Sequence, residues 1–272
     1  MMLIDSGEGT QVSLKMLGWG FKSIDAICFT HFHADHISGL PGLLLTIGNS
    51  HRIEPLTLVG PPGLERVARS LLVIAQDLPF DINIIELEFI KGQFLEFCGM
   101  RLSAYPMEHR VKCIGYSVCL PRAGKFDLQR ARALNIPVNL WNKLQKGESP
   151  EFEGRVYTPE MVLGEARRGI KVSYCTDSRP PDGIVDFVKD SDLFVCEGIY
   201  GENDKLDKAI DHRHMIFCEA AEIAASAKVR ELWLTHFSPS LTHPEAFLSN
   251  ATDIFPKTII GRDRMSVTLT FD

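Results

Sequence analysis

The stretch THFHADH, residues 30–36, places three histidines and one aspartate within seven residues. The whole chain of 272 residues contains nine histidines, so this segment holds a third of them. It overlaps the end of IDAICFT (24–30), a short and mostly apolar run that predicts a buried β-strand. Imidazole and carboxylate groups gathered at the end of a strand are typical of a metal site.

Three further candidate ligands lie at the ends of other strand-like runs. His109 closes the run QFLEFCGMRLSAYPMEH, Asp177 closes GIKVSYCTD (169–177), and His236 closes VRELWLTH (229–236). Because side chains at the carboxyl ends of strands meet at one crevice in α/β proteins, we expect one site assembled from distant segments. The predicted metal ligands are His31, His33, Asp35, His36, His109, Asp177 and His236.

The spacing within 30–36 predicts two neighbouring ions instead of one. His31 and His33 stand two residues apart and can point to one side of an extended turn, whereas Asp35 and His36 face the other way. One predicted ligand set is His31, His33 and His109. The other set is Asp35, His36 and His236, and Asp177 is predicted to bridge both ions. Nitrogen and oxygen donors without thiolate suit two Zn²⁺ ions per chain, and Mn²⁺ or Fe are alternatives.

Composition and sequence pattern argue against a membrane-spanning protein, a protein with a signal peptide and a disulfide-linked protein. The net charge is −6, hydrophobic residues make up 45% and charged residues 24%, which is ordinary for a globular protein. No apolar run reaches the length of a membrane span, and the start MMLIDSGEGT has no signal-peptide pattern. The seven cysteines are dispersed and never spaced C-x-x-C, which indicates reduced thiols and a cytoplasmic location.

Strand-like runs alternate with helical ones along the chain, which predicts an α/β protein. Helices are expected at 39–48, 64–78 and 214–227, and a half-buried strand at 266–271. The segment at about 121–168 interrupts this order and is rich in proline, glycine and charge. It is too long for an ordinary loop, and Asp127 is expected to cap a short helix in it.

Basic residues concentrate in this interrupting segment. Between 122 and 146 there is a single acidic residue, Asp127, among six basic ones. The run is either an ordinary solvated face or a contact for nucleic acid phosphates. The basic residues are Arg122, Lys125, Arg130, Arg132, Lys143 and Lys146.

The pattern H-x-H-x-D-H after a buried strand resembles the signature of the metallo-β-lactamase superfamily. Further stretches resemble the ribonuclease Z family, endonucleases that trim tRNA precursors on the 3′ side. They follow the family order across nearly the whole chain. The stretches are IDSGEGTQ (4–11), THFHADHISGLPGLL (30–44), GKFDLQRARALNIP with KLQKGE (124–148), YCTDSRP (174–180), EAAEIA (219–224) and LTHFSP (234–239).

The resemblance implies one domain, 1–272, with an αββα sandwich of two packed sheets flanked by helices and a tRNA-gripping arm at 121–168. It also implies an endoribonuclease that removes 3′ trailers from tRNA precursors with a hydroxide held by two metal ions, and a homodimer. Asp35 would orient that hydroxide. His214 would protonate the leaving oxygen, although His212 is a nearby alternative, and Glu197 is a candidate for orienting His214.

Three features depart from the family pattern. The chain lacks the two strands that usually precede D-x-G-E-G-T-Q, so an edge of the first sheet is expected to be missing. The usual H-S-T reads His214-Met215-Ile216 here, and PVNLW (137–141) replaces the Gly-Pro pair of the arm. Two alternatives therefore stay open: a small-molecule phosphodiesterase, sulfatase or lactonase of the same superfamily, and an inactive RNA-binding or scaffold protein.

Overall fold

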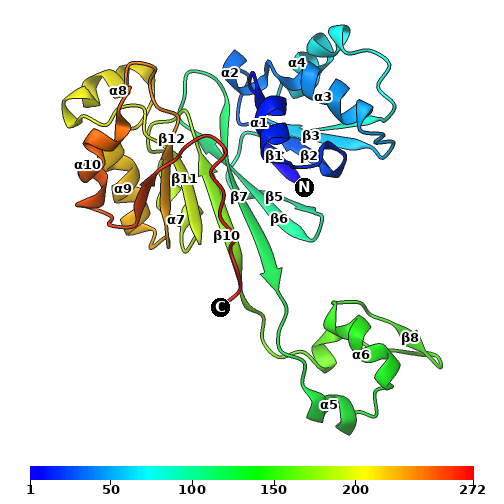
Figure 1. The fold of residues 1–272 in the computed structure, drawn as a ribbon. Coiled ribbons are helices and arrows are strands. Elements are labelled where there is room, and N and C mark those ends of the chain that lie inside the picture. Colours follow the sequence, from blue (N-terminus) through cyan, green and yellow to red (C-terminus); the bar gives the residue numbers. More distant parts are fainter. The chain divides into compact units, whose positions relative to one another are not determined.

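Two β-sheets with their covering helices form the larger of two units in this computed structural model, which describes residues 1–272 (Figure 1). The larger unit comprises residues 1–95, 102–118 and 171–268. The smaller unit comprises residues 96–101, 119–170 and 269–272. Strands β7 (Cys113–Arg122) and β10 (Arg167–Cys175) carry the chain between the two units.

The first sheet consists of four parallel strands in the order β1-β2-β3-β4. Their bounds are Met2–Ile4, Ala26–Cys28, Leu56–Gly60 and Ile82–Glu86. Every residue of β2 and β3 is buried, as expected for parallel strands that are covered on both faces. The carboxyl end of β2 therefore delivers residues 30–36 to one edge of this sheet.

The second sheet has seven strands in the order β13-β12-β11-β10-β7-β6-β5. The strands from β10 to β13 are parallel, so Asp177 and His236 follow the carboxyl ends of strands that point the same way. The remaining bounds are β5 Gln93–Phe97, β6 Met100–Met107, β11 Leu193–Glu197, β12 Leu232–Thr235 and β13 Thr258–Ile260.

Helices cover the outer face of each sheet. Those of the first half of the chain are α1 Thr10–Met16, α2 Ala34–Ile37, α3 Leu40–Asn49 and α4 Leu64–Leu71. Those of the second half are α7 Ile184–Val188, α8 Leu206–His212, α9 Phe217–Ser226 and α10 Ser249–Thr252. Short 3₁₀ turns lie at Phe21–Ser23, Leu72–Ile74, Pro159–Met161, Asn203–Lys205 and Pro244–Phe247.

Three apolar clusters hold these layers together. Leu43 and Leu44 of α3 pack with Leu58 of β3, and Phe217 of α9 packs with Phe194 of β11. A third cluster joins the two sheets face to face and contains Cys28, Val59, Leu102, Ile114 and Tyr116. The predicted sandwich of two packed sheets flanked by helices is therefore confirmed.

The smaller unit has a core of its own. Its elements are α5 Leu128–Ala133, α6 Val138–Gln145, β8 Glu151–Phe152 and β9 Arg155–Val156. The carboxylate of Asp127 accepts a hydrogen bond from the Arg130 amide at 2.9 Å, so the predicted helix cap is confirmed. The core side chains are Ala131, Ile136, Leu140, Leu144, Tyr157 and Val162.

Two expectations about local structure are wrong. Residues 266–271 form no strand, because alternating residues need a neighbouring strand to pair their backbone groups and this segment has none. The expected helix 64–78 ends its α-helical part at Leu71 and closes with a 3₁₀ turn. Among the helices of the structure, none combines the length and apolar character needed to cross a membrane.

Candidate metal centre

The loop after β1 packs directly on the helix that carries Asp35 and His36. The Ser6 amide donates to the His36 carbonyl at 2.8 Å, and the Gly39 amide donates to the Ser6 carbonyl at 2.9 Å. A Cβ on Gly7 would lie 1.9 Å from the Asp35 carbonyl oxygen. Only glycine therefore permits this close approach, which holds the short helix α2 at the end of the first sheet.

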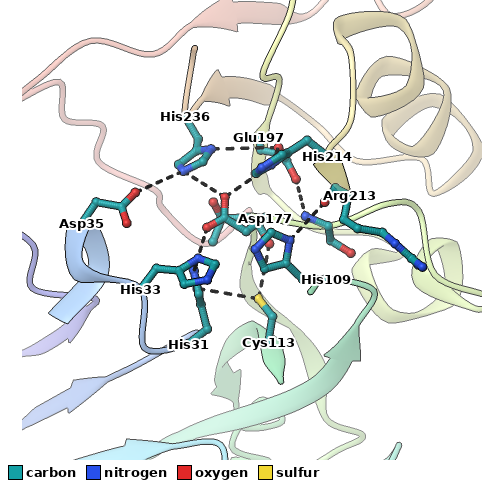
Figure 2. A network of polar contacts seen from close by, with 12 residues as sticks. His31, His33, Asp35, His109, Cys113, Asp177, Glu197, Arg213, His214 and His236 are labelled. Atoms are coloured by element: carbon teal, nitrogen blue, oxygen red, sulfur yellow. Dashed lines mark hydrogen bonds and ion pairs between the residues drawn. The ribbon is translucent and has the colours of Figure 1, made fainter. Parts of the chain in front are cut away.

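All seven predicted ligands meet at the carboxyl ends of the strands. Six of them, all except His36, are labelled in Figure 2. Ligand atoms of His31, His33, His109 and Asp177 lie within 4.8 Å of one another. Those of Asp35, His36 and His236 form a second group with the same spacing. These two groups contain the members of the two ligand sets predicted from the sequence.

Asp177 is the carboxylate that touches both groups. Its Oδ2 lies 3.0 Å from His31 Nε2 and 2.9 Å from His36 Nε2, while its Oδ1 lies 2.9 Å from His236 Nε2. The residue is 2% exposed and has a left-handed backbone with φ 45°. Burial opposes ionisation of this carboxyl group, but hydrogen bonds from the histidines dominate and hold its pKa far below the usual range.

The donor atoms fit a divalent cation. His109 Nε2 is buried and has no hydrogen-bond partner, whereas its Nδ1 lies 3.2 Å from the Arg213 carbonyl oxygen. Asp177 Oδ1 makes the ion-pair contact with His236 but no well-formed hydrogen bond. Buried polar atoms rarely stay unpaired, so both are available to a metal ion. Imidazole and carboxylate donors make this a site for a divalent metal.

The charges of the ligands depend on their neighbours. Burial opposes protonation of His36 and His236, but their close contacts with the Asp177 carboxylate dominate and raise the pKa to about 9 for His36 and about 10 for His236. Burial lowers the pKa of His109 to about 4. The neighbouring His236, whose Nε2 lies 3.9 Å from Asp35 Oδ2, lowers the pKa of Asp35 to about 2, so this carboxylate is ionised at neutral pH.

Asp5 is a site residue that the sequence reasoning missed. Its carboxylate accepts hydrogen bonds from the Thr30 amide and the Thr30 hydroxyl, both at 2.8 Å, and lies 2.8 Å from His36 Nδ1. The Thr30 hydroxyl lies 3.0 Å from His31 Nδ1. Asp5 thus orients one ligand directly and another through a hydroxyl group. An aspartate between a strand and the glycine-rich turn SGEG was the available signal.

His214, and not His212, contacts the cluster of ligands. His214 Nδ1 lies 2.8 Å from Glu197 Oε2 and 3.5 Å from Asp177 Oδ1. Glu197 is fully buried, and its burial raises the pKa of this carboxyl group against the effect of the hydrogen bond with His214. His212 is exposed at the end of α8 and reaches only the rim of the site.

An arginine clamp holds the segment that carries His214. Arg179 Nη1 donates to the His214 carbonyl oxygen at 2.6 Å and to Glu219 Oε2 at 2.8 Å. The Glu219 carboxylate also accepts the Ile216 amide at 3.0 Å, at the start of α9. The side chains of Arg179 and Glu219 are each 15% exposed, so this bidentate pair is well shielded from water.

The cluster opens to solvent through a hollow of about 180 Å³, called here the metal-side hollow. Arg110 and His212 join the candidate ligands at its rim. The full lining consists of His33, Asp35, His109, Arg110, Asp177, His212, His214 and His236.

The six predicted substrate contacts lie in the smaller unit and not among these residues. Arg122 lies over the Phe271 ring at 4.9 Å and donates to the Asp272 carbonyl oxygen. The other five are exposed, namely Lys125, Arg130, Arg132, Lys143 and Lys146.

Known proteins resemble the chain in sequence and in fold. Residues 2–104 match the model of the metallo-β-lactamase superfamily. The chain is 55% identical to ribonuclease Z of Lachnospira eligens and 52% identical to ribonuclease Z of Clostridium acetobutylicum. Each alignment covers 100% of this chain and 89% of the relative. Human tRNase Z, short form, aligns with a TM-score of 0.68 at 22% identity, covering 99% of this chain and 88% of that one.

Proposed function

The chain belongs to the ribonuclease Z family of the metallo-β-lactamase superfamily, and we propose that it removes 3′ trailers from tRNA precursors as a metal-dependent endoribonuclease. The observation that carries this proposal is the convergence of the seven ligands on Asp177 within a chain that covers 89% of its ribonuclease Z relatives. The alternative of an inactive scaffold has no explanation for buried ligand atoms that lack other partners.

We propose two Zn²⁺ ions per chain. His31, His33 and His109 would hold one ion, while Asp35, His36 and His236 would hold the other. The contacts of Asp177 with members of both groups support its role as the bridging ligand. When bound, such ions lower the pKa of water and offset the negative charge of the phosphodiester. All donors are imidazole nitrogens or carboxylate oxygens, which supports zinc, and manganese or iron would fit the same donors.

The residues around the ions would supply proton transfer and orientation. Asp35 is ionised and 65% exposed at the hollow, so it would orient the attacking water and accept its proton. The Nδ1 of His214 would donate to Glu197, which leaves Nε2 to give a proton to the leaving 3′ oxygen. The product on the tRNA side would therefore end in a 3′-hydroxyl group.

Exposed cations in the smaller unit would contact the RNA backbone. Arg130 and Lys143 extend from α5 and α6, whose apolar faces are used in the core of this unit. Phosphate contacts of this kind position a nucleic acid without reading its sequence. Since Arg122 is engaged by Phe271 and Asp272, it is the least suited of the six to this role.

A homodimer in the cytoplasm completes the proposal. Val12 and Met16 on α1 are 55% and 64% exposed, and nearby Trp19 is 47% exposed, so this surface could be buried by a second copy. All seven cysteines are free, which is compatible with a reducing compartment. Light scattering coupled to size-exclusion chromatography measures the mass and would show whether the dimer forms.

One parallel assay tests the function. The purified protein is incubated with a tRNA precursor carrying a 3′ trailer and, separately, with bis(p-nitrophenyl) phosphate. We expect cleavage of the precursor to a product with a 3′-hydroxyl end, and loss of that cleavage after dialysis against a chelator. Hydrolysis of the small diester without cleavage of any precursor would favour the small-molecule alternative, and inactivity on both with full metal content would favour the scaffold.

A further inference from the structure

The start of β7 is a point where the second sheet contacts the segment that carries His31. The Tyr116 hydroxyl donates to the Phe29 carbonyl oxygen at 2.7 Å, and the Ile114 amide donates to the Thr30 carbonyl oxygen at 2.9 Å. Both acceptors directly follow β2 of the first sheet, whereas β7 belongs to the second sheet. Residues 113–116, called here the inter-sheet segment, therefore hold the two carbonyl groups that precede His31 in the chain.

Cys113 in the same segment lies between the two sides of the candidate metal centre. Its Sγ is 3.6 Å from the Thr176 carbonyl oxygen, to which the thiol donates, and 4.0 Å from His31 Nδ1. Figure 2 shows the Cys113 sulfur beside the His31 ring. Thr176 directly precedes Asp177 in the chain. The inter-sheet segment thus contacts the neighbours of two candidate ligands that come from different sheets.

These contacts are shielded from water. Tyr116 and Cys113 are both 0% exposed, Tyr116 in the cluster between the sheets with Cys28, and Cys113 in the cluster that contains Cys175. A buried carbonyl group that loses its donor cannot easily gain a water molecule instead, so the surrounding backbone has to shift or the group stays unpaired. The loss of either side chain's hydrogen bond should therefore be felt at the adjacent ligand.

The position of the His31 ring depends on the backbone that the inter-sheet segment holds. The Thr30 hydroxyl donates to Asp5 Oδ2 at 2.8 Å, so its oxygen accepts the Nδ1–H of His31 at 3.0 Å. This arrangement leaves Nε2 as the ligand atom, and Nε2 lies 3.0 Å from Asp177 Oδ2. A shift of the Thr30 backbone would move the ring away from Asp177.

We propose that Tyr116 and Cys113 are positioning residues that set the spacing between His31 and Asp177. Tyr116 acts through the backbone before His31, and Cys113 acts through the Thr176 carbonyl group before Asp177. Both side chains would thereby tune the affinity for the ion assigned to His31, His33 and His109. The inference rests on the proposed function, because it requires a metal ion held by these histidines.

The test measures Zn²⁺ affinity by competition with a chromophoric chelator. Tyr116→Phe keeps the ring and removes the hydroxyl donor, and Cys113→Val keeps a side chain of similar size and removes the thiol donor. Each should bind one of the two ions about 10-fold more weakly, the lower end of the usual cost of losing a group that orients a ligand, and the other ion nearly as before. Cys113→Ser retains a donor and should stay close to the parent protein.

Tyr105→Phe is the matched control. Tyr105 is also buried, at 7% exposure, and its hydroxyl donates to the carbonyl oxygen of Asp182, which is not next to any candidate ligand. This variant should lower the melting temperature about as much as Tyr116→Phe while it keeps the parent affinity for both ions. Excess Zn²⁺ should restore precursor cleavage by Tyr116→Phe, because the weakened ion returns by mass action.

Several results would overturn the inference. These are parent affinity for both ions in Tyr116→Phe, an equal loss of affinity in Tyr105→Phe, or equal losses in Cys113→Ser and Cys113→Val, which would show that the thiol does not act as a donor. If Cys113→Val does not fold, Tyr116→Phe and its control still decide. A parent protein that binds two ions but cleaves no precursor would reject the proposed activity and leave the inference standing on the affinities.

Discussion

At the scale of single residues, the site depends on a few buried side chains with more than one partner. Asp177 touches three of the candidate ligand histidines, and Asp5 contacts His36 directly and His31 through the Thr30 hydroxyl. In each case one carboxylate fixes the positions of residues from both ligand groups, directly or through Thr30. Substitution of such a residue should therefore affect metal binding as well as catalysis.

Asp177→Ala should lose metal and activity together. The change removes the carboxylate that contacts both groups and leaves the facing histidines without a negative charge between them. We expect the parent protein to contain close to two ions per chain by elemental analysis and the variant to contain far less. A variant that keeps both ions at full occupancy would contradict the bridging role.

Asp5→Ala should lower metal affinity by roughly 10- to 100-fold, the usual cost of losing a group that orients a ligand. It should also destabilise the fold by about 1–3 kcal/mol, because the nitrogen of His36 and the hydroxyl of Thr30 lose a buried partner. Competition with a metal chelator measures the first effect and urea denaturation the second. Affinity equal to that of the parent protein would show that the ligands need no such support.

His214→Ala should keep its metals while precursor cleavage slows by about 10²–10⁴-fold, the usual contribution of general acid–base catalysis. His212→Ala is the matched control, since this histidine is exposed at the rim and contacts none of the ligands. Its rate should stay close to the parent value. The reverse pattern, with His212→Ala impaired and His214→Ala active, would show that the two histidines have been assigned wrongly.

At the scale of elements, the start of α9 holds the segment that carries His214. Arg179 follows β10, Glu219 lies in the first turn of α9, and their pairing joins two elements that are distant in sequence. The pair constrains the His214 carbonyl group, so a change at the helix start is expected to shift the position of this histidine.

Glu219→Gln should lower kcat for precursor cleavage with little change in KM or in metal content. The amide keeps the size of the side chain but replaces the charged bidentate pair with Arg179 by weaker hydrogen bonds. Glu222→Gln, one turn further along α9, is the control because its exposed side chain does not contact Arg179. Equal kcat values for the two variants would argue against a positioning role for Glu219.

At the scale of the whole molecule, the larger unit contains the metal centre and the smaller unit contains the exposed basic residues. The smaller unit also has its own apolar core. This division allows hydrolysis at the candidate metal centre and the proposed RNA contacts of the smaller unit to be tested separately.

Replacing residues 121–168 with a short linker should impair cleavage of a tRNA precursor far more than hydrolysis of bis(p-nitrophenyl) phosphate. The small diester needs the metal centre alone, whereas the precursor also needs phosphate contacts. Charge reversal at Arg130 or Arg132 should reduce the dependence of binding on salt, since each lost contact lowers the slope of log affinity against log salt. Equal loss on both substrates would show that the segment is needed for folding.

The meeting of the candidate ligands at one site and the layer order could be predicted from the sequence alone. Close spacing within 30–36 restricts those side chains to one turn, and apolar runs that end on His109, Asp177 and His236 place the others at strand ends. Local patterns of this kind determine which segments become strands. The helix cap at Asp127 was equally predictable, because its hydrogen bond spans three residues.

Only the tertiary structure decided which distant groups meet. Asp5 reaches Thr30 and His36, Arg179 reaches Glu219, and Glu197 reaches His214 across separations that no local pattern encodes. The segment 266–271 also shows that a local pattern does not determine pairing. Its residues alternate as in a strand, but no neighbouring strand pairs with it. The periodicity of apolar residues depends on neighbours along the chain. Strand pairing and the hydrogen bonds that orient the candidate metal ligands depend instead on how the two sheets pack.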